Sequence, residues 1–335
     1  MTERPRDTAE AQRPGIRRVN FQLLPFSYVV GQDDLKEMLK IAWVMGSSVG
    51  GVLVSGERGT AKSTIVRSFA KMMYDGLPTT LPINATDDRV MGGWNIEALM
   101  EGNPERKAGL LKQANDNGML YIDEVNLLDD HIVNLILDVV STGVLVVERD
   151  GIDDQGDQEE IVSFMLIGTM NPDEGSLRPQ MLDRFGLFVP VRAEDEESVR
   201  KDILETVLRF DIERNAGYQS AWLRQGMLED AQAKREIEAA KRAAPTVRVT
   251  DETRQLCARV AARYEVVGHR AEIVMAKAAR AVAALGRRGQ TAPRDVRRVA
   301  EYAIRHRRRE VIYPDGFAWS AKDQALLDEL IPPEG

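Results

Sequence analysis

The stretch VLVSGERGTAKST, residues 52–64, decides the fold that this sequence predicts. The β-branched run from Val52 to Val54 is typical of a buried strand, and the segment from Lys62 to about Tyr74 is typical of a helix. Between them, Gly56 and Gly59 allow backbone N–H groups to turn toward one point. A strand, a glycine-rich loop and a helix in this order predict a P-loop in a parallel α/β sheet.

The residue types in the loop suit the binding of ATP and Mg²⁺. Lys62 supplies a positive charge for the β- and γ-phosphates, Ser63 offers a hydroxyl to Mg²⁺, and the helix N-terminus adds its dipole. Ala61 stands where the usual pattern has Gly, which is tolerable if that position is already helical. The expected nucleotide contacts of the loop are Gly56, Glu57, Arg58, Gly59, Thr60, Ala61, Lys62, Ser63 and Thr64.

A second buried strand is predicted over Gly118–Glu124, where four apolar residues precede two acids. Ligands gather at the carboxyl edge of a parallel sheet. We therefore expect Asp123 to hold Mg²⁺, directly or through water, and Glu124 to polarise the attacking water.

Two further strands are predicted over Gly143–Arg149 and Glu160–Ile167, joined as a hairpin by an acidic loop that contains glycine. The second strand ends in Gly168-Thr-Met-Asn171. A polar amide at a strand tip beside Asp123 suits the orientation of the lytic water, so Asn171 is the sensor candidate.

Two arginines follow the sensor on a short helical segment, Leu177–Phe185. In a ring ATPase such an arginine points at the γ-phosphate in the neighbouring subunit. Arg184 is the first choice for this role and Arg178 the second. The alternative is a structural arginine paired with Asp183 or Glu174.

The segment ahead of the first strand carries a candidate adenine contact. Val29, Val30 and Gly31 precede a predicted helix over Asp33–Trp43, and in P-loop ATPases such a segment often packs on the adenine ring. The alternative is an ordinary turn at the edge of the core. Leu81–Asn84 predicts a short strand, and the charged, glycine-rich stretch Thr86–Gly109 predicts an insertion that projects from the surface.

From Glu196 onward the pattern is helical, which predicts a second, all-α domain. Arg270, at the start of a predicted helix, could reach back over the nucleotide cleft; the alternative is a surface arginine. A short helix is predicted over Ser320–Leu330. The expected divisions are a flexible leader at 1–24, an ATPase domain at 25–195, a lid at 196–310 and a tail at 311–335.

Composition limits the class of protein. The chain has 335 residues, of which 43% are hydrophobic and 29% charged, as in soluble globular proteins. The sequence predicts no membrane span and no signal peptide. The single Cys257 excludes an internal disulfide and any multi-cysteine zinc site, and it suits a reducing cytoplasm.

The net charge of −8 argues against generic nucleic-acid binding, but the charge is uneven. Lys277–Arg309 is strongly basic, whereas Asp150–Glu160 and Glu194–Glu197 are acidic. These runs are either solvated faces or complementary surfaces that meet across a subunit boundary.

The order of these features resembles an AAA+ ATPase. Four stretches resemble, more specifically, the ATPase (I) subunit of magnesium chelatase: INATDDRVMG (residues 83–92), LYIDEVNLLDDH (120–131), GTMNPDEG (168–175) and LRPQMLDRFG (177–186). The resemblance implies roles for Lys62, Ser63, Asp123 and Glu124 in the ATP site. By this resemblance, Asn171 would be sensor 1, Arg184 the arginine finger that acts in trans, and Arg270 sensor 2. Residues 86–109 would be the helix-2 insertion, and residues 143–167 the presensor hairpin.

The same resemblance implies an ATP-driven ring, usually a hexamer. Its partners would be a D subunit with an integrin or von Willebrand-type domain and a large catalytic H subunit, which inserts the metal. A MoxR-like chaperone that acts with a von Willebrand-type partner is the alternative, and Ala61 fits that relative as well. A nucleic-acid motor that uses Arg287–Arg309 is disfavoured by the net charge, and a non-hydrolysing scaffold by the complete set of catalytic residues.

Overall fold

The computed structural model describes residues 23–94, 98, 100, 106–147, 158–216, 219–309 and 318–333. Most of the expected leader, most of the acidic hairpin loop and residues 310–317 lie outside the described residues. None of the described helices combines the length and the apolar character that crossing a membrane requires.

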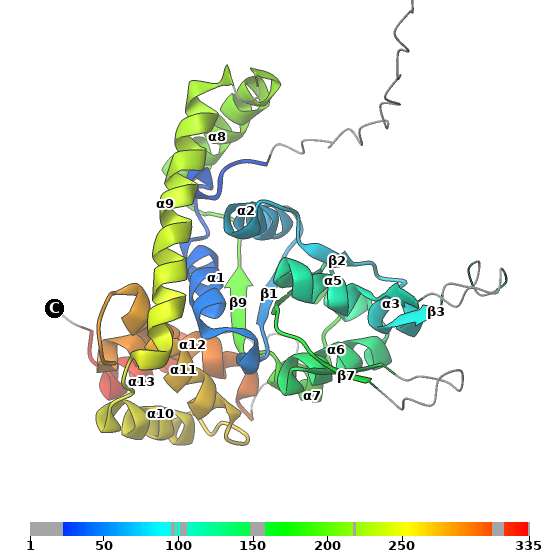
Figure 1. The fold of residues 1–335 in the computed structure, drawn as a ribbon. Coiled ribbons are helices and arrows are strands. Elements are labelled where there is room, and N and C mark those ends of the chain that lie inside the picture. The colour runs from blue at the N-terminus through cyan, green and yellow to red at the C-terminus, as the bar shows by residue number, and fades with distance from the viewer. Residues whose placement is uncertain are drawn as a thin grey trace, which may run out of the picture.

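Five parallel strands form the central sheet in the order β2-β5-β8-β1-β9, which confirms the predicted parallel α/β sheet (Figure 1). They are β2 (Thr79–Leu81), β5 (Met119–Ile122), β8 (Met165–Met170), β1 (Val52–Gly56) and β9 (Leu187–Val191). In the register of β1, Val54 lies opposite Thr169 on one side and Val189 on the other. Because the strands are parallel, all their carboxyl ends meet at one edge, the carboxyl edge, and their starts at the amino edge.

Both faces of the sheet are buried, and alternate residues of β1 serve two different cores. Val52 and Val54 belong to a core with helices α1 and α2 and the helical lid, and Leu53 belongs to a core with α5, α6 and α7. The bounds are α1 (Asp33–Met45), α2 (Lys62–Tyr74), α5 (Leu110–Asn117), α6 (Asp130–Thr142) and α7 (Pro179–Arg184). Helices on both faces explain why the strands are continuous apolar runs.

Two predicted strands differ from the structure. The strand expected over Leu81–Asn84 is β2, which ends at Leu81 because Pro82 has no N–H to continue a ladder. The run predicted as one strand over Glu160–Ile167 is two strands, β7 (Gln158–Ile161) and β8. The backbone N–H of Ser163 donates to Asn115 Oδ1 at 2.9 Å, so the chain leaves one sheet and enters another inside an apolar run.

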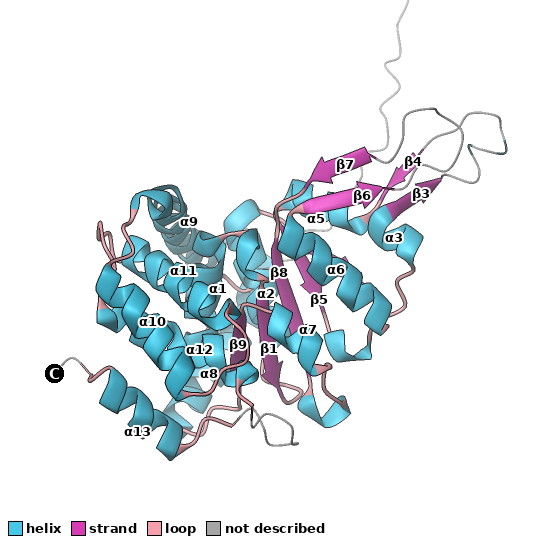
Figure 2. Ribbon diagram, turned by 90° about the horizontal axis from the view of Figure 1, so that it is seen from below, coloured by secondary structure: helices cyan, strands magenta, loops and turns pink. Residues whose placement is uncertain are grey.

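Two antiparallel ribbons project from the same end of the molecule (Figure 2). The pair β6 (Val144–Val147) and β7 confirms the predicted hairpin. The pair β3 (Gly92–Trp94) and β4 (Arg106–Ala108), with α3 (Asp87–Met91) before it, occupies the predicted insertion.

The second half of the chain is helical, as predicted. The helices are α8 (Glu197–Ala216), α9 (Ala221–Ala243), α10 (Asp251–Arg263), α11 (Arg270–Leu285), α12 (Pro293–Ile304) and α13 (Ala321–Leu330). Short 3-10 helices are η1 (Phe26–Tyr28), η2 (Ser47–Val49), η3 (Val125–Leu127), η4 (Pro172–Glu174), η6 (Ala244–Thr246) and η7 (Arg305–Arg307). Thr250 caps α10, since its side chain accepts from Thr253 N.

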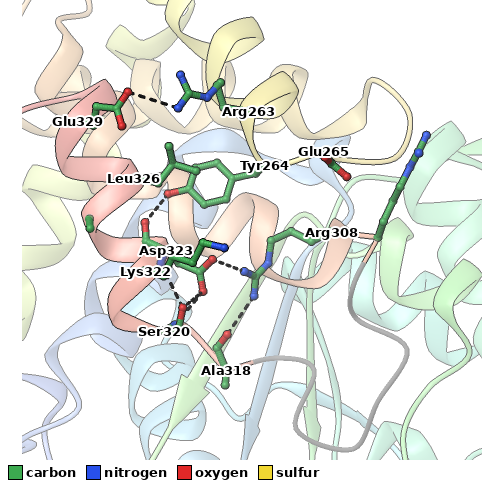
Figure 3. Close-up of a pocket in the computed structure, with 12 residues that line it drawn as sticks. Arg263, Tyr264, Glu265, Arg308, Ala318, Ser320, Lys322, Asp323, Leu326 and Glu329 are labelled. Atoms are coloured by element: carbon green, nitrogen blue, oxygen red, sulfur yellow. Dashed lines mark hydrogen bonds and ion pairs between the residues drawn. The ribbon is translucent and has the colours of Figure 1, made fainter.

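The last helix, α13, is held against the rest of the lid by polar contacts around an open pocket (Figure 3). The Tyr264 hydroxyl donates to Asp323 O at 2.7 Å, and Arg308 Nη1 lies 2.7 Å from Asp323 Oδ1. Arg263 pairs with Glu329 at 3.3 Å. The short helix predicted near the C-terminus is therefore present and packs on α10 and on the residues after η7.

The lid docks at the amino edge of the sheet through η7. Buried Arg307 donates from Nε to Asp183 Oδ1 at 3.0 Å and from Nη1 to Gly186 O at 3.0 Å. His306 Nε2 lies 3.0 Å from Phe185 O. These contacts fix α12 beneath the start of β9 and the end of α7.

Most arginines of the basic run bind carboxylates of the same chain. The pairs are Arg288–Asp295, Arg297–Asp328, Arg298–Glu37, Arg305–Glu301 and Arg308–Asp323. These pairs hold the lid together and, through Arg298 and Glu37, join it to α1. A guanidinium that is already paired attracts phosphate weakly, which argues further against a nucleic-acid motor.

Candidate nucleotide site

The P-loop occupies the carboxyl edge, where it joins β1 to α2. A Cβ on Gly56 would lie 2.1 Å from Val191 O, so only glycine fits there. Ala61 has a φ of +62°, which is the left-handed region and not the helical conformation in which alanine would be tolerated without strain. Alanine at this position therefore lowers the free energy of unfolding by about 1 kcal/mol relative to glycine.

The Lys62 ammonium lies over this loop. Its Nζ donates to Gly56 O at 2.5 Å and to Glu57 O at 2.6 Å, and it lies 3.4 Å from Thr60 Oγ1. Burial lowers the pKa of Lys62, while Asp123 and Glu124 favour its charged form. In this structure the Lys62 ammonium is thus held by carbonyl oxygens of the P-loop itself.

Ser63 and Asp123 meet next to Lys62. Ser63 Oγ lies 3.4 Å from both carboxylate oxygens of Asp123. The Tyr121 hydroxyl lies 2.8 Å from Asp123 Oδ1 and 2.9 Å from Ser63 Oγ, and Thr169 Oγ1 donates to Asp123 Oδ1 at 2.7 Å. Hydroxyl and carboxylate oxygens are the hard ligands that Mg²⁺ prefers, so these residues fit the expected ion.

The two other catalytic candidates flank this cluster. Glu124 has a φ of +56°, and its backbone N–H donates to Thr169 Oγ1 at 3.2 Å. Asn171 is buried and directly follows β8, the strand between β5 and β1, so it lies between the acids and the P-loop. Glu174 in η4 pairs with Arg58 of the P-loop, which ties the sensor segment to the loop.

Val30 and Gly31 lie at the same edge. They line a pocket with Pro190, Arg192 and Glu194, which lie at the carboxyl end of β9 and just beyond it. A Cβ on Gly31 would lie 2.5 Å from Glu194 Oε1, so the approach of these segments requires glycine. The structure therefore brings the candidate adenine contacts to the edge that holds the P-loop.

The candidate finger lies at the opposite edge. Arg184 ends α7, and two residues later the Gly186 N–H donates to Gly51 O, just before β1 begins. The five residues of β1 separate this point from the P-loop by about 16 Å at 3.3 Å per residue, which is farther than an arginine side chain reaches.

Within its own chain each candidate finger is paired. Arg184 lies 2.8 Å from Asp138, and Arg178 lies 2.5 Å from Asp130. The structural alternative named Asp183 or Glu174 as the partner, and the partners in the structure are carboxylates of α6 instead. Both pairs are at least partly exposed to solvent, so releasing either arginine costs about 1 kcal/mol or less.

Arg270 also lies at the amino edge. Its Nη1 donates to Asp183 Oδ2 at 3.0 Å and to Asp183 O at 3.1 Å. The expectation that Arg270 reaches back over its own nucleotide cleft is therefore corrected: the lid docks beneath β9, and this places Arg270 beside the candidate finger.

Sequence reasoning missed two residues of this arrangement, and for a third, Asp183, it missed the partner. Tyr121 and Thr169 hold Asp123, and Asp183 holds Arg270. Tyr121 has a signal in the sequence, because it is the one polar side chain in the strand MLYI and lies two residues before Asp123, on the same face.

Comparison with known proteins identifies the family of the chain. The model of the AAA domain (dynein-related subfamily) matches residues 51–185, and that of the AAA lid domain matches residues 254–330. The magnesium-chelatase subunit ChlI of Olisthodiscus luteus is 33% identical over 320 residues, which are 88% of this chain and 92% of that protein. The chain belongs to the magnesium-chelatase ChlI family. Like other ChlI-family chains, it is an AAA+ ATPase.

Two further matches set the extent of this likeness. An uncharacterized protein of Mycobacterium tuberculosis is 38% identical over 317 residues; the match covers 92% of this ChlI-family chain but about half, 48%, of that protein's length. A crystal structure from Cytophaga hutchinsonii has a TM-score of 0.63 at 18% identity, covers 91% of this chain and 90% of that chain, and supports the fold alone.

Proposed function

We propose that this chain hydrolyses Mg-ATP at a site shared by two copies of itself in a ring, for which the family resemblance suggests six copies. The observation that supports this proposal is the separation of the two halves of the site. Lys62 and Asp123 lie at the carboxyl edge, and Arg184 lies at the amino edge of the same sheet. A head-to-tail neighbour would bring one half to the other.

Each residue then has a defined task. Lys62 would bind the β- and γ-phosphates, and Ser63 and Asp123 would hold Mg²⁺, which neutralises charge on the triphosphate when bound. Glu124 would take the proton of the attacking water, and Asn171 would orient that water. Val30 and Gly31 would contact the adenine.

The neighbouring copy would complete the site with two guanidinium groups. Arg184 would leave Asp138, and Arg270 would remain beside Asp183, so that both supply positive charge as the γ-phosphate departs. An arginine in this role typically contributes about 10³–10⁵-fold to the rate.

We further propose that hydrolysis drives the remodelling of a partner complex that inserts metal into a tetrapyrrole. The printed names of the relatives, which describe them as subunits of magnesium chelatase, support this step. The expected partners are a D-like subunit with a von Willebrand-type domain and a large H-like subunit. This step is tested by using the Glu124→Gln variant with Mg-ATP to capture partner proteins from native lysate. Recovery of a D-like partner without an H-like one would favour a MoxR-like chaperone instead.

The shared site is tested by mixing two inactive variants. Arg184→Ala should lower turnover by about 10³-fold or more and leave nucleotide binding intact. Lys62→Ala should lose nucleotide binding. An equal mixture should recover activity, because the intact arginine of one copy stands beside the intact P-loop of the other. Arg263→Ala, in α10, is the matched control and should turn over normally. Full turnover by Arg184→Ala alone would exclude the finger.

A further inference from the structure

Helix α8 has apolar side chains on both of its sides. Ile203 and Phe210 are partly buried, while Leu204, Val207, Leu208 and Ile212 are 58%, 46%, 54% and 74% exposed and form a second side, the α8 stripe. No residue of α8 is fully buried. A helix that is apolar on both sides is normally covered on both sides.

The α8 stripe belongs to the carboxyl edge. Helix α8 begins six residues after β9 ends, and Arg200 Nη1 donates to Glu194 O, next to the pocket that contains Gly31. Figure 1 shows α8 at the top of the molecule, beyond α2, and away from the main body. The stripe therefore lies on the side from which a neighbour must deliver its arginines.

A second apolar patch lies at the amino edge. Val267 and Ile273 are 57% and 54% exposed, and they stand three residues before and three residues after Arg270. Figure 1 shows α11 at the bottom of the molecule, at the end opposite α8. This patch, the α11 patch, therefore accompanies the arginine that a shared site would bring to the next copy.

We propose that the α8 stripe of each copy docks on the α11 patch of the next copy. The inference rests on the proposed shared site, because that site requires the carboxyl edge of one copy to face the amino edge of another. Each chain carries both surfaces at opposite ends, so the contact is head-to-tail and repeats around a ring. Burial of the two patches would hold Arg270 and Arg184 at the neighbour's nucleotide.

Charge placed in the stripe tests the docking. Leu208→Asp should fold normally, because the side chain is exposed, and should raise the protein concentration needed for half-maximal assembly by about tenfold or more. Arg235→Asp, on the exposed side of α9, is the control and should assemble like the parent. Unchanged assembly of Leu208→Asp, measured by sedimentation with Mg-ATP, would overturn the proposal.

A cross-link tests the partner surface directly. Burial raises the pKa of the native Cys257 thiol to about 12, so this cysteine does not compete. Leu208→Cys mixed with Ile273→Cys should give a covalent dimer on mild oxidation, because the proposed docking places Leu208 of one copy beside Ile273 of the next. Within one chain the two positions lie at opposite edges of the sheet. Leu208→Cys mixed with Lys322→Cys, which carries its thiol on α13, should not. Absence of the first dimer would overturn the docking.

The two proposals fail separately. If the mixture of Lys62→Ala and Arg184→Ala recovers activity while the thiols do not cross-link, the shared site stands and the α8 docking is wrong. If the thiols cross-link but the mixture stays inactive, the copies meet as proposed and the arginine assignment is wrong.

Discussion

Arg270 and Arg307 bind the two carboxylate oxygens of one residue, Asp183, each at 3.0 Å. Asp183 directly precedes Arg184 in α7. The buried Arg307 keeps this carboxylate in place from below, and burial lowers the pKa of its guanidinium to about 10, which still leaves it charged at neutral pH. Because Arg270 and Arg307 belong to the lid and Asp183 adjoins Arg184, we expect the lid and the candidate finger to move together.

Arg270→Ala should separate binding from turnover. Because Arg270 lies at the amino edge, nucleotide affinity of dilute single copies should be unchanged, while turnover of the assembled protein should fall by about 10²-fold. Asp183 remains held by Arg307, so the fold should persist. Nucleotide titration at low protein concentration and turnover at high concentration measure the two effects, with Arg263→Ala as the control. A weaker affinity of single copies would contradict the placement.

Glu124→Gln should trap ATP. Glutamine keeps the shape of the side chain but cannot accept a proton, so hydrolysis should fall by about 10²-fold or more while Mg-ATP stays bound. Retention of radiolabelled ATP after gel filtration measures the trap, and Glu252→Gln, on α10, is the control. A Glu124→Gln protein that releases ADP at the parent rate would remove Glu124 as the base.

Tyr121→Phe should weaken the metal site. Burial raises the pKa of the Tyr121 hydroxyl, so it stays protonated and can donate to Asp123. Loss of one hydrogen bond is worth about 1 kcal/mol, so the Mg²⁺ concentration for half-maximal turnover should rise about fivefold. Tyr74→Phe is a matched control, because the buried Tyr74 hydroxyl has no partner among the described residues. Identical Mg²⁺ curves for Tyr121→Phe and the parent would count against this role.

His306 should make stability depend on pH. Burial lowers the pKa of His306 well below its usual value, and the neighbouring Arg307 adds to this effect. The unfolded chain therefore takes up a proton, near its pKa of about 6.5, before the folded chain does. The free energy of unfolding should fall from about pH 7 toward about pH 5, by up to about 1.4 kcal/mol per pH unit.

The variant His306→Phe isolates this contribution. A phenyl ring can keep the stacking against Phe188, whose ring centre is 5.7 Å away, and it cannot take up a proton. Urea titrations at pH 7 and pH 5.5 should show a smaller loss of stability than in the parent. Equal pH slopes for His306→Phe and the parent would refute the assignment.

The elements around the nucleotide could be predicted because each has a strong local signal. The helix after the P-loop spans Lys62–Tyr74, as the sequence indicated, and Asp123 and Asn171 follow neighbouring strands. The break between β7 and β8 could not be predicted, because Val162 and Phe164 continue an apolar run, and the Asn115 contact that redirects the chain is distant in sequence.

The position of Arg270 depends on contacts that no local pattern encodes. The lid docks through Arg307 and His306 onto backbone carbonyls at the start of β9, more than 120 residues away. Helical periodicity predicts α11 and α12, but it contains no information on which end of the sheet they cover. Likewise, the left-handed Ala61 could not be distinguished from a first helical residue by its type alone.

Helix α9 binds two segments of the ATPase domain. Asp230 accepts from the backbone N–H groups of Phe26 and Ser27, just before the adenine segment, and Glu238 accepts from Trp43 two turns later. With 23 residues, α9 is about 34 Å long, and Figure 1 shows it as one straight helix. If bound adenine tilts residues 26–31, α9 would tilt with them, and its N-terminal end, which is joined to α8, would move farther than the segment itself. Binding of nucleotide to one copy would therefore shift the surface that contacts the next copy.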